Sequence, residues 1–150
     1  MPCIVAAPPG GLSPSGMVHS GAAVNLTTSF TQVGNWAADP SRPGSSVTGG
    51  NALAVADGGL ANITSSVLFA NSAASRTITI EIRVDGTTVA TGGGTLAAFA
   101  SGVAFTANTA SPITVPAGAS VTYWAMSSAT TGTASVMSDA TSYVRVTPPS

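Results

Sequence analysis

The 150-residue sequence predicts an all-β protein, an antiparallel β-sandwich of the jelly-roll type with about eight strands. From Arg76 to Thr91, β-branched apolar residues alternate with polar ones, which is the period of a strand with one buried face. Turn signals made of proline and glycine recur along the chain at the spacing typical of sandwiches and jelly rolls. No capped amphipathic stretch has the helical period.

Residues 1–21 are expected to form an extended N-terminal arm, and residues 22–150 a single jelly-roll domain. Proline and glycine are frequent in the first segment, and its apolar residues follow no period. Such a segment cannot build a core alone, so we expect it to lie on a neighbouring protein. The apolar residues expected to dock there are Ile4, Val5, Leu12, Met17 and Val18.

The strongest strand prediction is an alternating segment followed by a tight turn. Asp85-Gly86 favours the positive φ angles of a type I′ hairpin, so residues 87–91 are expected to return as the partner strand. The glycine triplet 92–94 is interpreted as a loop. The residues expected to face the core from the first strand of this hairpin are Ile78, Ile80, Ile82 and Val84.

The other strands are placed by the same criteria. A second hairpin is predicted where residues 112–115 enter the turn Pro116-Ala117-Gly118 and residues 120–126 leave it. The last strand spans 141–147 and is ended by two prolines. Further strand candidates are residues 23–33, 51–56, 62–70 and 96–107.

Composition excludes several classes of partner. Charged residues make up 6% of the chain, with four arginines, no lysine, and a net charge of −1. So little positive charge cannot neutralise a run of phosphates, so neither nucleic-acid binding nor electrostatic attachment to a membrane is expected. No apolar run is long enough for membrane insertion, and the first residues lack the pattern of a signal peptide. Because charged residues are so few, side-chain hydroxyls must keep the surface soluble, or other subunits must cover much of it.

Residues that could carry chemistry are few, and we expect no enzymatic activity, cofactor or metal. The one histidine, His19, lies in the predicted arm, where it is expected to face solvent or a subunit interface rather than act as a base. Cys3 and His19 together are fewer than the three or four protein ligands that zinc takes. Asp39 and Asp57 stand beside proline and glycine, as turn-forming residues do.

The aromatic residues suggest a contact with other subunits. Tyr123 and Trp124 are adjacent on one predicted strand, so their side chains must point to opposite faces, and one of them lies outside the core. Tyrosine and tryptophan are favoured at subunit contacts. The candidate interface residues are Tyr123, Trp124 and Tyr143. Stacking of a carbohydrate on Trp36 or Trp124 is the alternative interpretation.

Three segments occur in the order found in a known family. They are the hairpin at Val84–Ala90, the stretch Ile113–Thr122, and the closing strand Ser142–Val146. Over residues 75–147 the chain resembles the tumour-necrosis-factor-like and complement-globular-head jelly rolls, whose relatives include phage proteins. The resemblance implies a homotrimer in which a tyrosine or phenylalanine of the inner sheet lines the three-fold axis.

The resemblance and the neutral, lysine-free composition together favour a small virion protein of a tailed bacteriophage, assembled in the host cytoplasm. A trimeric capsid decoration protein, bound to the major capsid protein or another virion protein, is the first hypothesis. A tail-fibre or tail-tip module that contacts the host is the second. A carbohydrate-binding module, with a host surface glycan as ligand, is the third.

Overall fold

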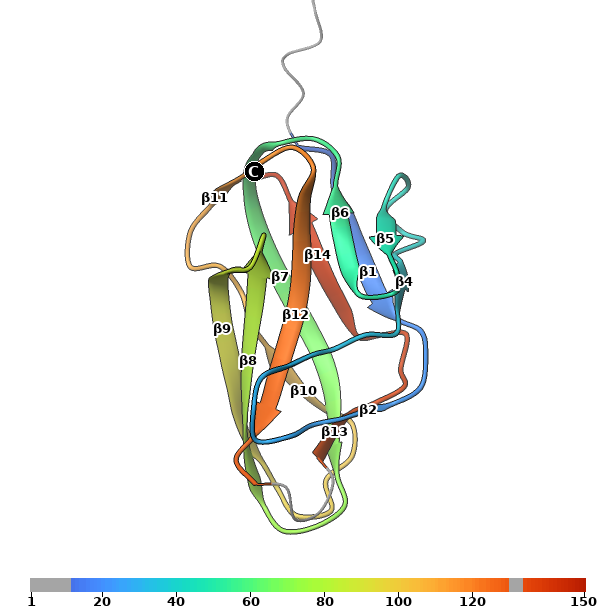
Figure 1. The fold of residues 1–150 in the computed structure, drawn as a ribbon, viewed down its shortest axis with the longest axis vertical. Coiled ribbons are helices and arrows are strands. Elements are labelled where there is room, and N and C mark those ends of the chain that lie inside the picture. Colours follow the sequence, from blue (N-terminus) through green and yellow to red (C-terminus); the bar gives the residue numbers. More distant parts are fainter. Residues whose placement is uncertain (1–11, 130–133) are drawn as a thin grey trace, which may run out of the picture.

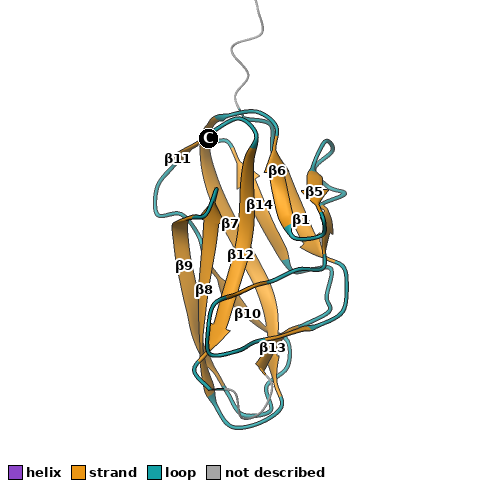
Figure 2. Cartoon of the chain, in the orientation of Figure 1, coloured by secondary structure: helices purple, strands orange, loops and turns teal. Residues whose placement is uncertain are grey.

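The computed structural model describes residues 12–129 and 134–150. These residues form strands joined by turns and loops, and none of them is helical (Figure 2). Consequently, no helix in the described ranges could cross a bilayer. The strands build two antiparallel sheets packed face to face. Eight of the described strands have four or more residues. The predicted antiparallel jelly roll is thereby confirmed.

One sheet has eight strands and contains both the first and the last strand of the described chain (Figure 1). Its main path runs β2-β13-β7-β14-β1-β4, and the long strand β7 also pairs with β10 and β11. The bounds in chain order are β1 Ser15–His19, β2 Val24–Asn25, β4 Trp36–Ala38, β7 Gly59–Asn71, β10 Val103–Thr106, β11 Ile113–Val115, β13 Ala134–Val136 and β14 Tyr143–Thr147.

The second sheet has six strands in the order β5-β6-β12-β8-β9, with β3 pairing with β12. It packs against the first sheet across a continuous apolar core. Its bounds are β3 Thr31–Gln32, β5 Ser46–Thr48, β6 Ala52–Val55, β8 Arg76–Val84, β9 Thr87–Leu96 and β12 Ala119–Ser127.

The alternating strand faces the core as predicted. Ile78, Ile80 and Ile82 are at most 1% exposed and Val84 7%, whereas Glu81 points to the outer face. The period-two pleat explains this division of side chains. The predicted hairpin is also confirmed, because Asp85 and Gly86 have φ angles of 49° and 83° and β9 pairs with β8.

The second predicted hairpin is wrong, although both of its strands exist. β11 pairs with β7 in the eight-stranded sheet, whereas β12 pairs with β6 and β8 in the other sheet. The turn between them therefore crosses from one sheet to the other. Its Gly118 has a φ of 78° and donates its N–H to the carbonyl of Val55 at 2.8 Å. Pattern and turn residues identify strands, but they do not say which sheet each strand joins.

The glycine triplet is not a loop. Gly92, Gly93 and Gly94 lie inside β9 and pair with residues of β8. A Cβ on Gly92 would lie 1.9 Å from the carbonyl oxygen of Thr106, and one on Gly93 would lie 2.0 Å from that of Ile78. The triplet thus lets β9 pass between β8 and the segment around Thr106, where no side chain fits.

The expected boundary of the N-terminal arm at residue 21 is also corrected. Ser15–His19 forms β1, which lies between β14 and β4 within the sheet. Leu12 and Met17 are 2% and 0% exposed and belong to the core. The main-chain pairing with β14, far away in sequence, explains why this aperiodic segment is ordered. Ile4 and Val5 lie outside the described residues.

The remaining strand candidates are confirmed in part. Residues 51–56 contain β6, and residues 62–70 lie within β7, which extends beyond the prediction at both ends. Residues 23–33 form only the two-residue strands β2 and β3 within a segment that crosses from one sheet to the other. Between residues 96 and 107 the chain finishes β9, makes a loop and enters β10.

Candidate interaction surfaces

The outer face of the eight-stranded sheet carries mostly uncharged side chains, many of them small. Residues directly opposite each other in antiparallel strands share a face. The register therefore places one row of side chains across five strands, in the order Ala37, Val18, Tyr143, Ser66 and Thr106. Most of these residues are half-buried, and Thr106 is exposed. The row runs through the middle of the sheet.

Neighbouring rows have the same character. Leu68 lies opposite Ala104, Ala70 lies opposite Ser135, and Asn62 lies opposite Thr147. Among the described strand residues that point outward from this sheet, Arg145 is the one with a charge. Strands of this extent with a single outward charge, joined at one edge by Asp39 and Arg42 of the loop after β4, are the main unusual feature of the surface.

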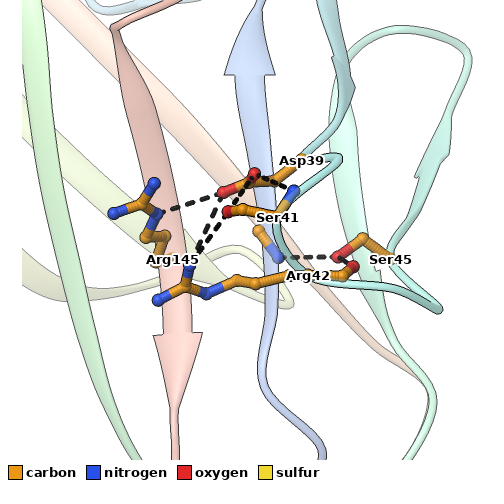
Figure 3. Close-up of polar contacts among 6 residues, drawn as sticks. Asp39, Ser41, Arg42, Ser45 and Arg145 are labelled. Carbon is orange, nitrogen blue, oxygen red and sulfur yellow. Dashed lines mark hydrogen bonds and ion pairs between the residues drawn. The ribbon is translucent and has the colours of Figure 1, made fainter.

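The charge of Arg145 is neutralised within the same chain (Figure 3). Its Nε donates to Oδ2 of Asp39 at 3.1 Å, and its guanidinium lies 4.0 Å from the ring centroid of Tyr143. Arg42 is a second cation near Asp39, at 3.7 Å. Gly16 lies beneath this cluster, and a Cβ there would be 3.1 Å from both Arg145 and Asp39. The glycine at this position leaves room for the ion pair.

Asp39 is held in its ionised form. Its side chain is only 3% exposed, and burial by itself would raise the pKa. The backbone N–H and hydroxyl of Ser41 donate to its Oδ1 at 2.9 and 2.6 Å, and Arg145 adds an opposite charge. These bonds outweigh burial, so the pKa of Asp39 lies below its ordinary 3.8. Asp39 thus forms a turn, as predicted, and also supplies the counter-charge for Arg145.

The outer face of the six-stranded sheet carries a different cluster. The guanidinium of Arg83 lies 4.2 Å from the ring centroid of Trp124 and 5.6 Å from that of Phe30. Arg83 also forms an ion pair with Glu81 at 2.8 Å. The indole N–H of Trp124 donates to the hydroxyl of Thr122 at 2.8 Å. The cluster attaches the crossing segment that carries Phe30 to the sheet.

The three predicted interface residues are not brought together. Tyr123 is fully buried in the core, so it has no surface to offer another subunit. Trp124 and Tyr143 are half-buried on opposite outer faces of the sandwich, because β12 and β14 belong to different sheets. The prediction that one residue of the Tyr123-Trp124 pair lies outside the core holds for Trp124.

The prediction for His19, and the sugar-stacking alternative as far as it concerns Trp36, fail because both residues lie inside the sandwich. Trp36 is 4% exposed, which leaves no ring face for a sugar, and His19 is 0% exposed instead of facing solvent or an interface. The two rings pack edge to face with centroids 5.2 Å apart, and Trp36 contacts Tyr123 at 5.7 Å. The three aromatic side chains thus connect the two sheets.

Neither nitrogen of His19 has a hydrogen-bond partner, and the hydroxyl of Tyr123 has none either. Burial lowers the pKa of His19 below its ordinary 6.5, while nearby backbone of Met137 and Gly34 opposes the shift. Burial raises the pKa of Tyr123 well above 10.0. In the described ranges no group of three or more His, Cys, Asp or Glu residues could hold a metal ion.

Some residues of interest were not singled out from the sequence. Arg145 pairs with Asp39 across 106 positions, which no local pattern records. Ser66, Leu68 and Ala104 lie on the outer face of segments that were predicted as strands without assignment of their two faces. A signal did exist for β7, because its outward residues are unusually free of charge for a face exposed to water.

Comparison with known proteins supports the fold. No protein-family model matches the chain, and no curated protein sequence matches it. Among the solved structures that match, two are similar to this chain over nearly their whole length. The structure of Eiger TNF from S. frugiperda aligns with a TM-score of 0.63 at 10% identity, and the alignment covers 94% of this chain and 94% of Eiger. The fold is a tumour-necrosis-factor-like jelly roll. Murine APRIL aligns with a TM-score of 0.56 at 15% identity, covering 91% of this chain and 99% of its own.

Proposed function

We propose that this chain is a non-enzymatic structural protein of a virion, a homotrimer that decorates the capsid of a tailed bacteriophage. The observation that carries the proposal is the neutral outer face of the eight-stranded sheet. The tumour-necrosis-factor-like fold supports the trimer, because the resemblance implies assembly around an axis lined by an aromatic residue of one sheet. Tyr143 lies in the central row of that face.

The chemistry of this face suits contact between subunits. Interface cores are depleted in charged residues, and aromatic residues are enriched there. The guanidinium of Arg145 is already paired with Asp39, which reduces the cost of covering it, while Arg42 at the edge of the face shares the same carboxylate. Serine and threonine hydroxyls can hydrogen-bond to a second copy as readily as to water. A closed ring of three copies would bury these surfaces together.

A charge placed in the middle of this face should prevent assembly. In Ser66→Arg, a trimer would bring three guanidinium groups together in a buried contact, and such like-charge contacts cost several kcal/mol. We expect sedimentation equilibrium to give a trimer for the wild type and a monomer for this variant. Thr79→Arg is the matched control, because Thr79 is equally half-buried on the outer face of the other sheet. A trimeric Ser66→Arg variant would contradict the proposed interface.

The number of copies per purified particle tests the role in the virion. A decoration protein covers a repeated lattice, so quantitative mass spectrometry should find hundreds of copies per particle. A few to a few dozen copies would place the chain on the tail, as expected for a tail-fibre or tail-tip module that contacts the host. Absence from purified particles would reject both virion roles.

A further inference from the structure

The loop between β9 and β10 displays an aromatic side chain in an unusual way. Phe99 is 77% exposed, more than any other large apolar residue in the described ranges. Its φ of +57° lies in the left-handed region that bulky residues rarely adopt. The loop lies at the end of the sandwich opposite the C-terminus and the start of the described chain (Figure 1).

The loop is held in place by a buried side chain. Asn71 is 3% exposed, and its Nδ2 donates to the carbonyls of Ala74 at 2.8 Å and Ala97 at 3.1 Å. Its backbone N–H donates to the carbonyl of Ala100 at 2.8 Å, and that of Phe99 donates to Ala73 at 3.2 Å. These bonds fix the backbone on both sides of Phe99, so its Cα–Cβ bond has one direction and the ring stays outside the core.

Two features of Phe99 are unfavourable for the isolated chain. The ring gains little from burial, and the left-handed backbone is strained for a residue with a Cβ. Glycine would remove both disadvantages, and glycine is abundant in this sequence. Strained residues that the surrounding structure holds in place often belong to contact sites. The exposed ring, the strained backbone and the buried Asn71 that holds the loop together indicate that Phe99 contacts another molecule.

The surroundings of Phe99 define the partner. The described residues of the adjoining loops, 71–75, 97–102 and 128–129, include no charged side chain. An apolar ring on a backbone held in place, with no charge around it, fits an apolar pocket on a protein. A fluid bilayer would gain nothing from rigid presentation, and one phenyl ring is too small an anchor for it.

We propose that Phe99 is the anchor that docks the chain on a protein of the particle surface, by inserting its ring into an apolar pocket there. This inference rests on the proposed virion function and replaces the N-terminal arm as the main docking element. Cyclic symmetry would place three copies of Phe99 on the same side of a trimer. Three simultaneous contacts would then raise the avidity well above that of one.

The test uses particles assembled from the same genome with this reading frame deleted, to which purified protein is added back. Phe99→Gly removes the ring and relieves the strained backbone. We expect it to keep the trimer mass, to melt no lower than the wild type, and to bind particles at least about 30-fold more weakly. Leu60→Ala is the control, since Leu60 is the other exposed large apolar residue in the described ranges, at 54%. It should bind like the wild type.

Several outcomes would overturn the inference. Equal binding by Phe99→Gly and wild type would show that the anchor lies elsewhere, while the virion function would stand. Equal losses in Phe99→Gly and Leu60→Ala would remove the specific role of the ring. Failure of the wild type itself to bind would reject the virion function and this partner with it. Binding of the wild type to phosphatidylcholine vesicles, lost in Phe99→Gly, would favour a bilayer over a protein pocket.

Discussion

Gly93→Ala is expected to destabilise the protein by more than about 3 kcal/mol, because its new methyl group has no space. The Cβ would lie 2.0 Å from the carbonyl oxygen of Ile78, on the neighbouring strand β8. The φ of +123° adds backbone strain for any residue other than glycine. Only separation of β9 from β8 would relieve the clash. Thermal unfolding should show a melting temperature lower by about 10 °C.

Gly86→Ala is the matched control for this prediction. Gly86 also has a positive φ, at 83°, but no atom lies within 4 Å of the position its Cβ would take. The control therefore retains the backbone strain and omits the clash, so we expect a loss of only about 1 kcal/mol. Equal decreases in melting temperature for the two variants would show that β9 does not pass as close to β8 as described.

The Gly93 position also illustrates how far the sequence alone could be interpreted. Three consecutive glycines are typical of a loop, and only the close approach of two neighbouring strands explains them inside β9. The hairpin at Asp85-Gly86 was predictable because its strand pattern and its turn are both local. The pairing of β11 with β7 was not predictable, since partners distant in the sequence determine it.

The same contrast between local features and long-range pairing applies to the candidate surfaces. The alternation of Tyr123 and Trp124 between core and outer face was predictable from the pleat of a single strand. That Trp124 and Tyr143 lie on opposite sides of the sandwich depends on which sheet each strand joins. β1 was missed for a related reason. Its inward residues are Ser15, Met17 and His19, so its pattern of apolar residues is weak, and its order comes from pairing with β14.

Lowering the pH below about 6.5 is expected to destabilise the fold through His19. Its pKa is lowered by burial, so the unfolded chain binds a proton at a pH where the folded chain does not. The stability that the neutral ring contributes is complete above 6.5 and is lost as the pH falls from 6.5 to the folded-state pKa. One group can change the free energy of unfolding by at most about 1.4 kcal/mol per pH unit. Denaturant unfolding between pH 8 and pH 4 measures this slope.

His19→Phe isolates the contribution of the imidazole. The phenyl ring can keep the edge-to-face contact with Trp36, and it needs no hydrogen-bond partner where His19 has none. Because His19 is the one histidine of the chain, the variant should show no change in stability between pH 6.5 and pH 4. A second decrease, below 3.8, should remain in both proteins, since protonation of Asp39 removes its ion pair with Arg145. A wild-type stability that stays constant from pH 8 to pH 4 would contradict the prediction, and would mean that the backbone of Met137 and Gly34 compensates for burial when the ring is charged.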